Sequence, residues 1–362
     1  MAGAEWDRQE IEERRDGTQT TLATGAVSKT LLGETFPLRD LPRSTTDEVG
    51  LYAQNEIAYG MVTLIPGVRW DFYRLDAQTD AVFADAERLT DLQHDRLSLR
   101  LGATVQPWTP LTLYANYAQG FRAPPAEDVN LFLDLPQFGV VSLPNPDLEP
   151  ERSDTIEAGL RWHEAGVAVE ASGYYATYDD FIQSRSRLGT DPESGLTVFQ
   201  SRNLESATIY GAEAFARLAL YRLSDRLAPW TIDAGLHWAE GENDRTDEPL
   251  NDVAPLKLIA NLRWQSTHWP IESGLRVTHL ARKSDVDRTA GDVFVAPDAT
   301  LLDLTTRWQP NERFDLVLGV YNLTNERYWR YADVRHFEPG DPRIEVASQP
   351  GIHADLTVNV RF

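Results

Sequence analysis

Two residues near the end of the chain carry side chains that could bind a metal centre. His336 and Tyr331 lie in the segment YADVRHFEPGDPR, whose Gly and Pro residues predict a loop. Imidazole and phenolate groups both ligate metal ions and metal-containing groups. His336, with Tyr331 as a second candidate, is therefore a candidate contact for an external ligand. The alternative is that both side chains are solvated or hydrogen-bonded within the loop.

Two further histidines, His163 and His237, occupy polar positions in segments that alternate apolar and polar residues, beside carboxylates and arginines. Such a set could relay protons or hold a metal. The alternative is a polar wall that satisfies its charges internally or with water. The chain has no Cys and no G-x-S-x-G elbow, so we assign no catalytic residue and expect no enzyme.

The composition limits the partners. A net charge of -22 disfavours nucleic acid, because phosphate contacts require Lys and Arg. Two acidic segments, AEGENDRTDEPLND and DAQTDAVFADAERLTD, lack the fixed spacing of a calcium-binding loop. We read them as solvated surface, and we assign no metal site and no cofactor.

Amphipathic strands must position these groups. The chain contains no run of about 18 apolar residues that could form a membrane helix. Instead it shows about fourteen segments of alternating polarity, each about as long as a tilted membrane-crossing strand. The clearest lie at Leu97–Gln106, Ile156–His163, Leu256–Trp264 and Ala354–Phe362. Alternation alone is compatible with either a soluble sandwich or a wide barrel.

Connection lengths separate these two folds. Short links alternate strictly with long ones, which places all short links on one rim, as expected of an up-and-down transmembrane barrel. The short links are residues 58–61, 106–109, 164–166, 265–269 and 309–313; the long ones are 75–94, 122–152, 182–202, 240–252, 283–298 and 326–350.

Tryptophan placement supports the barrel. Six tryptophans and the terminal Phe362 fall at or beside the short-turn rim, where a membrane barrel carries an aromatic girdle. They are Trp108, Trp162, Trp230, Trp264, Trp269 and Trp308. We therefore predict an all-β fold, an antiparallel transmembrane up-and-down β-barrel.

Short motifs occur in order along residues 48–362. A FRAP box is followed by an NPDL box, a G-x-E strand at Gly211–Glu213 and a late Y-N-L-T-N box. In this order they resemble the TonB-dependent outer-membrane receptor family, and most closely its haem and haemoglobin receptor branch. The matching residues are Phe121, Arg122, Ala123 and Pro124, then Asn145, Pro146, Asp147 and Leu148, then Tyr321, Asn322 and Leu323.

The resemblance implies an outer-membrane receptor of a Gram-negative bacterium that contacts membrane lipid and takes up an iron-containing ligand. It also implies energy coupling through the TonB complex and a plug domain inside the lumen. The family pattern places a haem-ligating His between the two boxes, whereas Ala123–Pro144 contains no His. Haem and a siderophore therefore both remain open as ligands.

The same resemblance implies that part of the receptor is missing from this chain. We expect a barrel of about 22 strands in the whole receptor, with residues 18–362 as its C-terminal part and residues 1–17 as a polar lead-in or a truncated early strand. Met1 then looks like an internal or truncated start, and the plug domain is absent. The alternatives are a passive outer-membrane pore and a non-functional receptor fragment.

The FRAP box also has a purely structural interpretation. Pro124 and Pro125 would end the strand where the loop begins, because proline cannot donate to a ladder. Arg122 would pair with an acid inside the lumen.

Overall fold

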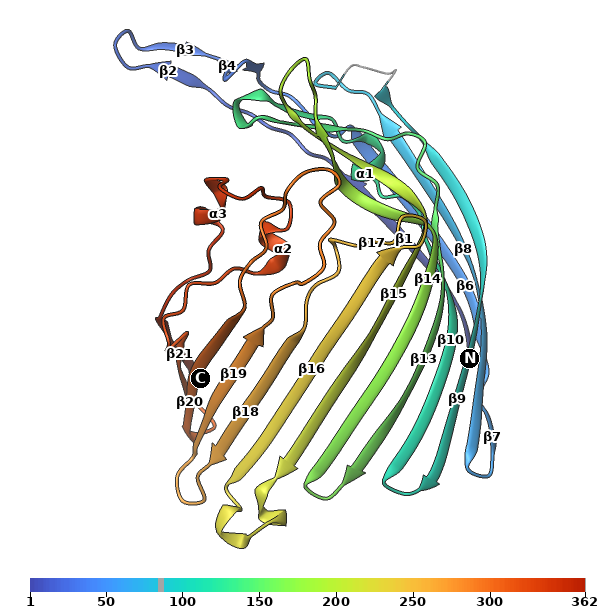
Figure 1. The fold of residues 1–362 in the computed structure, drawn as a ribbon, viewed down its shortest axis with the longest axis vertical. Helices are drawn as coiled ribbons and strands as arrows, with labels where there is room; N and C mark the ends of the chain where they lie inside the picture. The colour runs from blue at the N-terminus through green and yellow to red at the C-terminus, as the bar shows by residue number, and fades with distance from the viewer. Residues whose placement is uncertain (84–87, 362) are drawn as a thin grey trace.

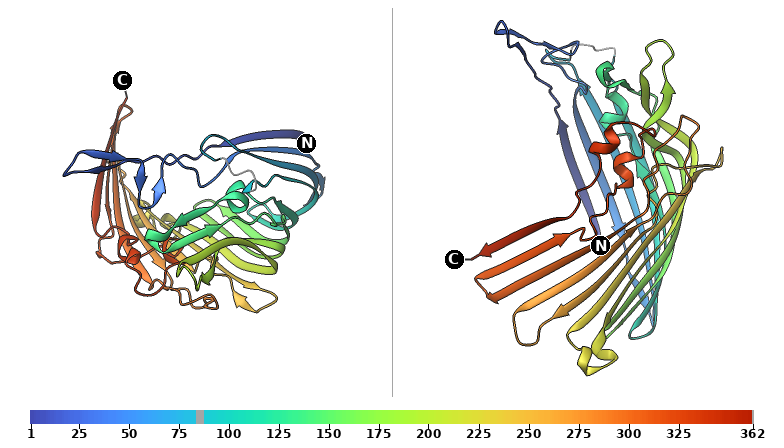
Figure 2. Two further views of the ribbon diagram at one scale, coloured as in Figure 1. Left: turned by 90° about the horizontal axis from the view of Figure 1, so that it is seen from above. Right: turned by 60° about the vertical axis from the view of Figure 1, so that its left-hand side comes forward.

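The computed structural model describes residues 1–83 and 88–361, which form one strongly curved antiparallel sheet (Figures 1 and 2). Within them, fourteen strands have eight or more residues, which confirms the expected number. They are β1 (Ala2–Ile11), β6 (Arg43–Gln54), β8 (Val62–Gln78), β9 (Leu92–Trp108), β10 (Leu111–Arg122), β13 (Glu151–Glu164), β14 (Val167–Thr190), β15 (Thr197–Ala219), β16 (Trp230–Asn243), β18 (Lys257–Gln265), β19 (Ile271–Leu280), β20 (Ala299–Asn311), β21 (Phe314–Tyr321) and β22 (His353–Val360).

Short strands and helices lie in the connections between the long strands. The short strands are β2 (Gln19–Thr21), β3 (Ala26–Ser28), β4 (Thr30–Leu31), β5 (Glu34–Thr35), β7 (Ile57–Tyr59), β11 (Leu133–Leu135), β12 (Val140–Leu143) and β17 (Glu248–Pro249). The helices are α1 (Ala126–Asn130), α2 (Tyr331–Val334) and α3 (Arg343–Val346). No helix among the described residues has the length and apolar character needed to cross a membrane.

Each long strand pairs antiparallel with the next long strand along the chain, from β1–β6 to β21–β22. The two outermost strands each pair on one side, and within the described residues no ladder joins β1 to β22. Every residue of β22 is exposed. The described residues therefore form an open, curved wall, with β1 and β22 as its edges (Figure 2).

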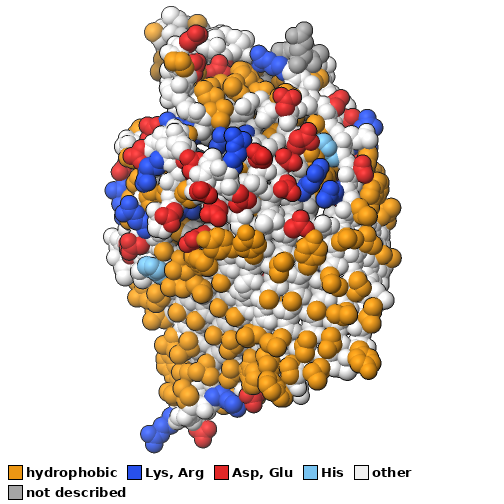
Figure 3. Space-filling model, turned by 45° about the vertical axis from the view of Figure 1, so that its right-hand side comes forward, with side chains coloured by type: hydrophobic (Ala, Val, Ile, Leu, Met, Phe, Trp, Pro, Cys, Tyr) orange, Lys and Arg blue, Asp and Glu red, His pale blue; other side chains and the backbone are white. Residues whose placement is uncertain are grey.

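The two faces of this wall differ in polarity, as the alternation predicted. Directly paired residues share a face, so Leu258 lies beside Leu236 on one side and Lys257 lies beside His237 on the other. Apolar side chains form a broad band across the outer face that Figure 3 shows, below the charged loop region. This distribution suits an outer face against lipid and a polar inner face along the lumen.

The two rims differ in connection length. Tight links join strands at the lower end in Figure 1, with one longer link at residues 220–229 that contains the short turns η3 (Leu220–Arg222) and η4 (Asp225–Leu227). Long loops occupy the opposite rim. One expected loop, residues 182–202, is mostly strand instead: β14 and β15 continue as a long hairpin with a turn at 191–196. The extended part of this hairpin lies beyond the apolar band of the wall, so its strands need no apolar face. Its sequence therefore does not alternate, and the pattern did not reveal it.

The aromatic girdle is found at the short-turn rim. Trp230 and Trp264 are opposite one another in register, with ring centroids 6.4 Å apart. Trp308 packs edge-on against Phe314 at 5.8 Å, and Trp108 and Trp269 are largely exposed. Phe362, expected to complete this girdle, lies outside the described residues.

Residues 1–17, set apart in the sequence as a lead-in or truncated strand, contain β1, which pairs with β6 along its whole length. Residues 12–42 then form a long loop whose β2–β3 hairpin projects beyond the other loops (Figure 1). Lys29 and Asp16 form an ion pair of 2.6 Å at the base of this hairpin.

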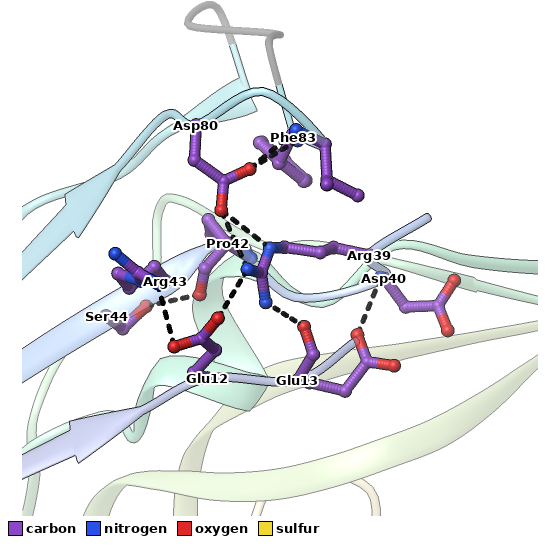
Figure 4. A network of polar contacts seen from close by, with 10 residues as sticks. Glu12, Glu13, Arg39, Asp40, Pro42, Arg43, Ser44, Asp80 and Phe83 are labelled. Atoms are coloured by element: carbon purple, nitrogen blue, oxygen red, sulfur yellow. Dashed lines mark hydrogen bonds and ion pairs between the residues drawn. The ribbon is translucent and has the colours of Figure 1, made fainter. Parts of the chain in front are cut away.

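A buried arginine attaches this loop to its neighbour (Figure 4). The Arg39 side chain is only 3% exposed and contacts Glu12 and Asp80, each at 2.8 Å. It also donates to the backbone carbonyl of Glu13. Arg43 contacts the same Glu12 at 2.8 Å but stays half exposed. Arg39 therefore joins residues 12–42 to the loop after β8.

We predict that Arg39→Met loosens both loops, because it removes two ion pairs and the hydrogen bond to the Glu13 backbone carbonyl at once. Amide hydrogen exchange in residues 12–42 and 79–83 should accelerate by about tenfold. Arg43→Met is the matched control, since an exposed pair contributes about 1 kcal/mol or less. Equal protection in both variants would show that Arg39 does not hold the loops.

The same contact should be sensitive to acid. The backbone N–H groups of Phe83 and Val82, together with the Arg39 guanidinium, lower the pKa of Asp80 to about 2. A lowered carboxyl pKa stabilises the folded loop above the ordinary Asp value of about 3.9, and the effect is lost as pH falls through the folded value. Exchange protection of Val82 and Phe83 should therefore decline between these two pH values. Asp80→Asn should remove that decline, and a decline that persists in this variant would contradict the assignment.

Candidate functional site

The long-loop rim holds the FRAP, NPDL and Y-N-L-T-N boxes, whereas the G-x-E motif at Gly211–Glu213 lies within β15 in the wall. The FRAP box ends β10 at Arg122, and Pro124 is fully buried, with its carbonyl accepting a hydrogen bond from the Tyr73 hydroxyl at 2.9 Å. Arg122 lies opposite Glu151 in register, with Nη1 3.6 Å from Oε2. The predicted strand end and the predicted pairing of Arg122 with an acid are both confirmed.

The helix after the FRAP box is attached to the β14–β15 hairpin through a buried carboxylate. Asp128 of α1 is 4% exposed and accepts hydrogen bonds from the hydroxyls of Ser184 and Ser201, each at 2.7 Å. Asn130, at the end of α1, exchanges hydrogen bonds with the backbone of Thr90. Sequence reasoning missed Asp128, whose partners lie 56 and 73 residues away.

The NPDL box also contacts β15 at Ser201. The Asn145 side chain donates to the Ser201 carbonyl at 2.9 Å and accepts the N–H of Asp147 at 3.1 Å. Pro146 follows Asn145 within this turn, and Leu148 is buried. The helix after the FRAP box and the NPDL box therefore meet at Ser201, the helix through the Ser201 hydroxyl and the box through the Ser201 carbonyl. Their observed contacts anchor loops.

The Y-N-L-T-N box closes the mouth of the last long loop. Tyr321 ends β21, and Leu323 bonds through its N–H to the Leu302 carbonyl. Asn322 is buried with a φ of 52°, a left-handed conformation that Asn tolerates better than most residues. Its side chain bonds to the backbone of Glu326 and to the carbonyl of Pro350, at 2.8 to 3.2 Å. Asn322 therefore holds the two ends of the loop together.

Tyr331, at the start of α2, is enclosed by neighbouring loops. It is 8% exposed, and its hydroxyl donates to the Asn251 carbonyl at 2.9 Å. Lys283 lies over the ring, with Nζ 5.7 Å from its centroid. Burial raises the pKa of Tyr331 and lowers the pKa of Lys283. In this conformation the phenol is neutral and hydrogen-bonded.

Asn251 joins three loops. Its side-chain amide donates to the Asp287 carbonyl at 2.8 Å, and its side-chain oxygen accepts the Asp287 N–H at 2.9 Å. Its own carbonyl accepts the Tyr331 hydroxyl. The neighbouring Asp252 pairs with Arg335 at 3.0 Å. The sequence offered no signal for Asn251, because its partners come from distant loops.

His336 remains accessible at the end of this assembly. Its Nε2 lies 3.0 Å from Nε of Arg335 and accepts that donor, so the contact requires a neutral ring. The protein packed around the ring, followed by the charge of Arg335, lowers the pKa of His336. The ring is therefore neutral at pH 7 and keeps one nitrogen outside this contact.

A small cavity of about 60 Å³ lies beside His336. Three guanidinium groups line it, from Arg187 and Arg202 on the β14–β15 hairpin and from Arg335. Arg187 pairs with Glu338, whereas the one partner of Arg202 among the described residues is the neutral Gln183, at 3.1 and 3.2 Å. In the part of the chain that the structure describes, no group of three or more His, Asp or Glu side chains is placed to hold a metal ion.

The two histidines of the inner wall belong to lateral pairs between strands. His163 lies 3.1 Å from Glu170, and His237 lies 3.7 Å from Glu213, each across one strand boundary. Deeper in the wall, the buried Asp233 is held between Arg217 at 2.6 Å and Arg263 at 2.7 Å. These contacts are those of a polar wall that pairs its own charges.

Comparison with known proteins adds a family match. The family described as TonB dependent receptor-like, beta-barrel matches residues 2–323. A "Probable hemoglobin and hemoglobin-haptoglobin-binding protein 4" of Haemophilus influenzae is 25% identical over 262 residues, covering 67% of this chain and 26% of that protein. This chain therefore spans about a quarter of the length of that relative.

Solved structures share the fold. The copper transporter OprC superposes with a TM-score of 0.76 at 19% identity, covering 100% of this chain and 55% of that chain. The FrpB iron transporter from Neisseria meningitidis superposes with a TM-score of 0.65 at 17% identity, covering 89% and 46%. The aligned part is thus about half of each of these proteins.

We predict that Tyr331→Phe loosens the loop assembly, because it leaves the half-buried Asn251 carbonyl without its donor at a cost of about 1 kcal/mol. Amide exchange in residues 244–256 and 322–352 should accelerate several-fold. Tyr328→Phe is the control, since the Tyr328 hydroxyl makes no hydrogen bond to a described residue. Unchanged exchange in Tyr331→Phe would mean that this bond does not hold the loops.

Proposed function

Because the chain belongs to the TonB-dependent receptor-like β-barrel family, we propose that it forms the wall and outer loops of an outer-membrane receptor that takes up an iron-containing ligand, haem or a siderophore. The observation that carries this proposal is the difference in connection length between the two rims. Tight turns close one rim, whereas interlocked loops cover the other, where an approaching ligand would be met. An apolar outside and a charged inside fit lipid and a water-filled lumen.

The ligand class rests on two further observations. The relative from Haemophilus influenzae is named for binding haemoglobin, and FrpB is named as an iron transporter. In this chain, Arg187, Arg202 and Arg335 line one cavity beside His336. Haem propionates and most siderophores carry anionic oxygens, which guanidinium groups bind well.

We place the candidate iron or haem contact at His336, since Ala123–Pro144 supplies no His. Its neutral ring has the protonation state that metal ligation requires. Tyr331 is the second candidate, and it would have to give up its hydrogen bond to Asn251 before binding a ligand.

Transport itself would need the rest of the receptor. By family membership we propose a plug within the lumen and energy coupling through the TonB complex in a Gram-negative outer membrane. The chain's own part would be binding and conduction, with no bond made or broken. A passive pore is the alternative if β1 and β22 pair with each other, and it would show no saturable binding at the loops.

The test measures binding of haemin, and separately of ferric enterobactin, to the purified chain in detergent micelles. We predict that His336→Ala weakens haemin binding by about tenfold or more and alters the haemin absorbance spectrum, because an axial ligand is lost. His268→Ala is the matched control, since His268 lies in the link between β18 and β19 on the opposite rim.

The outcomes separate the ligands. Saturable haemin binding that depends on His336 supports a haem receptor. Saturable binding of ferric enterobactin that depends on Arg202 and not on His336 supports a siderophore receptor. If neither ligand binds saturably, the receptor proposal is wrong and a passive pore or a non-functional fragment is left.

A further inference from the structure

The inner wall contains a second cavity, away from the loop cavity beside His336. Its volume is about 770 Å³, within the range of small-molecule sites. It lies against β1, β6, β8, β9 and β10. The charged and hydroxyl side chains that line it are Glu5, Asp7, Glu48, Tyr52, Arg69, Asp71, Tyr73, Ser98, Arg100 and Arg122.

One strand beside this cavity carries a column of unsatisfied donors. Four buried side-chain nitrogen or oxygen atoms in the described residues lack a hydrogen-bond partner, and three of them lie on alternate residues of β9. They are His94 Nε2, Arg96 Nε and Ser98 Oγ. The fourth atom, Arg15 Nε, lies 2.5 Å from Asp40 and is therefore ion-paired.

Such a column requires an explanation, because buried polar atoms in folded proteins are almost always bonded. Ser98 is only 8% exposed, yet it lines the cavity. The guanidinium nitrogens and the hydroxyl donate, and a histidine nitrogen can donate in one tautomer. Anionic oxygens are the acceptors that would satisfy these groups together.

Arg100 extends the column into the cavity. Across the ladders it faces Gly67 on β8 and Ala118 on β10, neither of which has a polar side chain. Arg100 makes no ion pair with any described residue, in contrast to Arg69, which binds Asp71 at 2.6 Å and Glu5 at 3.0 Å. Arg69 thereby occupies the two acids nearest the column. The guanidinium of Arg100 is left for a ligand.

The far side of the cavity has the opposite character. Asp7 on β1 and Glu48 on β6 are direct register partners and both line it. Neither makes a hydrogen bond or ion pair within the described residues. Two unpaired carboxylates side by side repel each other and attract a cation. The cavity is therefore polarised, with donors on β9 and carboxylates on β1 and β6.

We propose that this cavity binds a small zwitterionic molecule, with its carboxylate on Ser98 and Arg100, which both line it, and its cationic end between Asp7 and Glu48. The site lies on the lumen wall and uses none of the residues assigned to ligand capture at the loops. It goes beyond the proposed function and does not depend on it.

The probe is 6-aminohexanoate, measured by calorimetric titration against the purified chain in detergent micelles. Hexanoate and hexylamine each carry one of its two charged ends and serve as matched ligands. We expect saturable binding of 6-aminohexanoate that is tighter than binding of either matched ligand. No saturable binding, or equal binding of hexanoate, would overturn the proposal.

Substitutions test which residues bind the carboxylate end of 6-aminohexanoate. Arg100→Gln and Ser98→Ala should each weaken 6-aminohexanoate by about tenfold, as expected for a lost charge-assisted bond. Arg100→Lys should restore part of the affinity. The control is Arg276→Gln, because Arg276 lies on β19 and bonds to Asn261 at 2.9 Å. Equal loss in the control would reveal a general effect on the wall and would overturn the site.

Crossed measurements keep the two proposals separate. His336→Ala should leave 6-aminohexanoate binding unchanged, and Arg100→Gln should leave binding of haemin and ferric enterobactin unchanged. If the loops bind neither iron ligand while the lumen site binds its probe, the receptor proposal fails alone. If the reverse holds, the lumen site fails alone.

Discussion

The structure depends on one constraint: in a hydrocarbon layer every backbone N–H and C=O must find its partner within the protein. The continuous ladder from β1 to β22 meets this demand for each interior strand. Once backbone pairing is fixed, strand geometry sends alternate side chains to opposite faces. One pattern of residues therefore specifies both the apolar outside and the charged inside.

Charged side chains on the inner face then need partners of opposite charge. Many are matched across strand boundaries, as with Asp233 between Arg217 and Arg263, or Arg307 with Asp315 at 2.8 Å. Arginine suits this task because its forked donors reach carboxylates on two neighbouring strands at once. The donor column on β9 stands out against this background, because three buried side-chain atoms of this one strand lack a hydrogen-bond partner among the described residues.

The wall could be predicted from the sequence, and the loops could not. Alternation at Leu97–Gln106 or Leu256–Trp264 is local, so it specified the strands and their two faces without knowledge of any partner. Connection lengths, which are also read directly from the sequence, then assigned the two rims. Alternation did not predict the β14–β15 extension, because a strand outside lipid needs no apolar face. Asp128, Asn251 and Arg39 also escaped, since their partners lie tens of residues away and no local pattern records them.

The loop assembly has a consequence for how this surface can vary. Leu22, in the turn of the β2–β3 hairpin, is 97% exposed, and no residue of either short strand is buried. Substitution or insertion there disturbs no packed group, and longer surface loops cost little closure entropy. Asn251 permits no such freedom. Its side chain ties its own loop to the loop of Asp287, and its backbone carbonyl ties the same loop to that of Tyr331. The tip of the β2–β3 hairpin can therefore change in sequence and length while the interlocked loops behind it, which share Asn251, keep their shape.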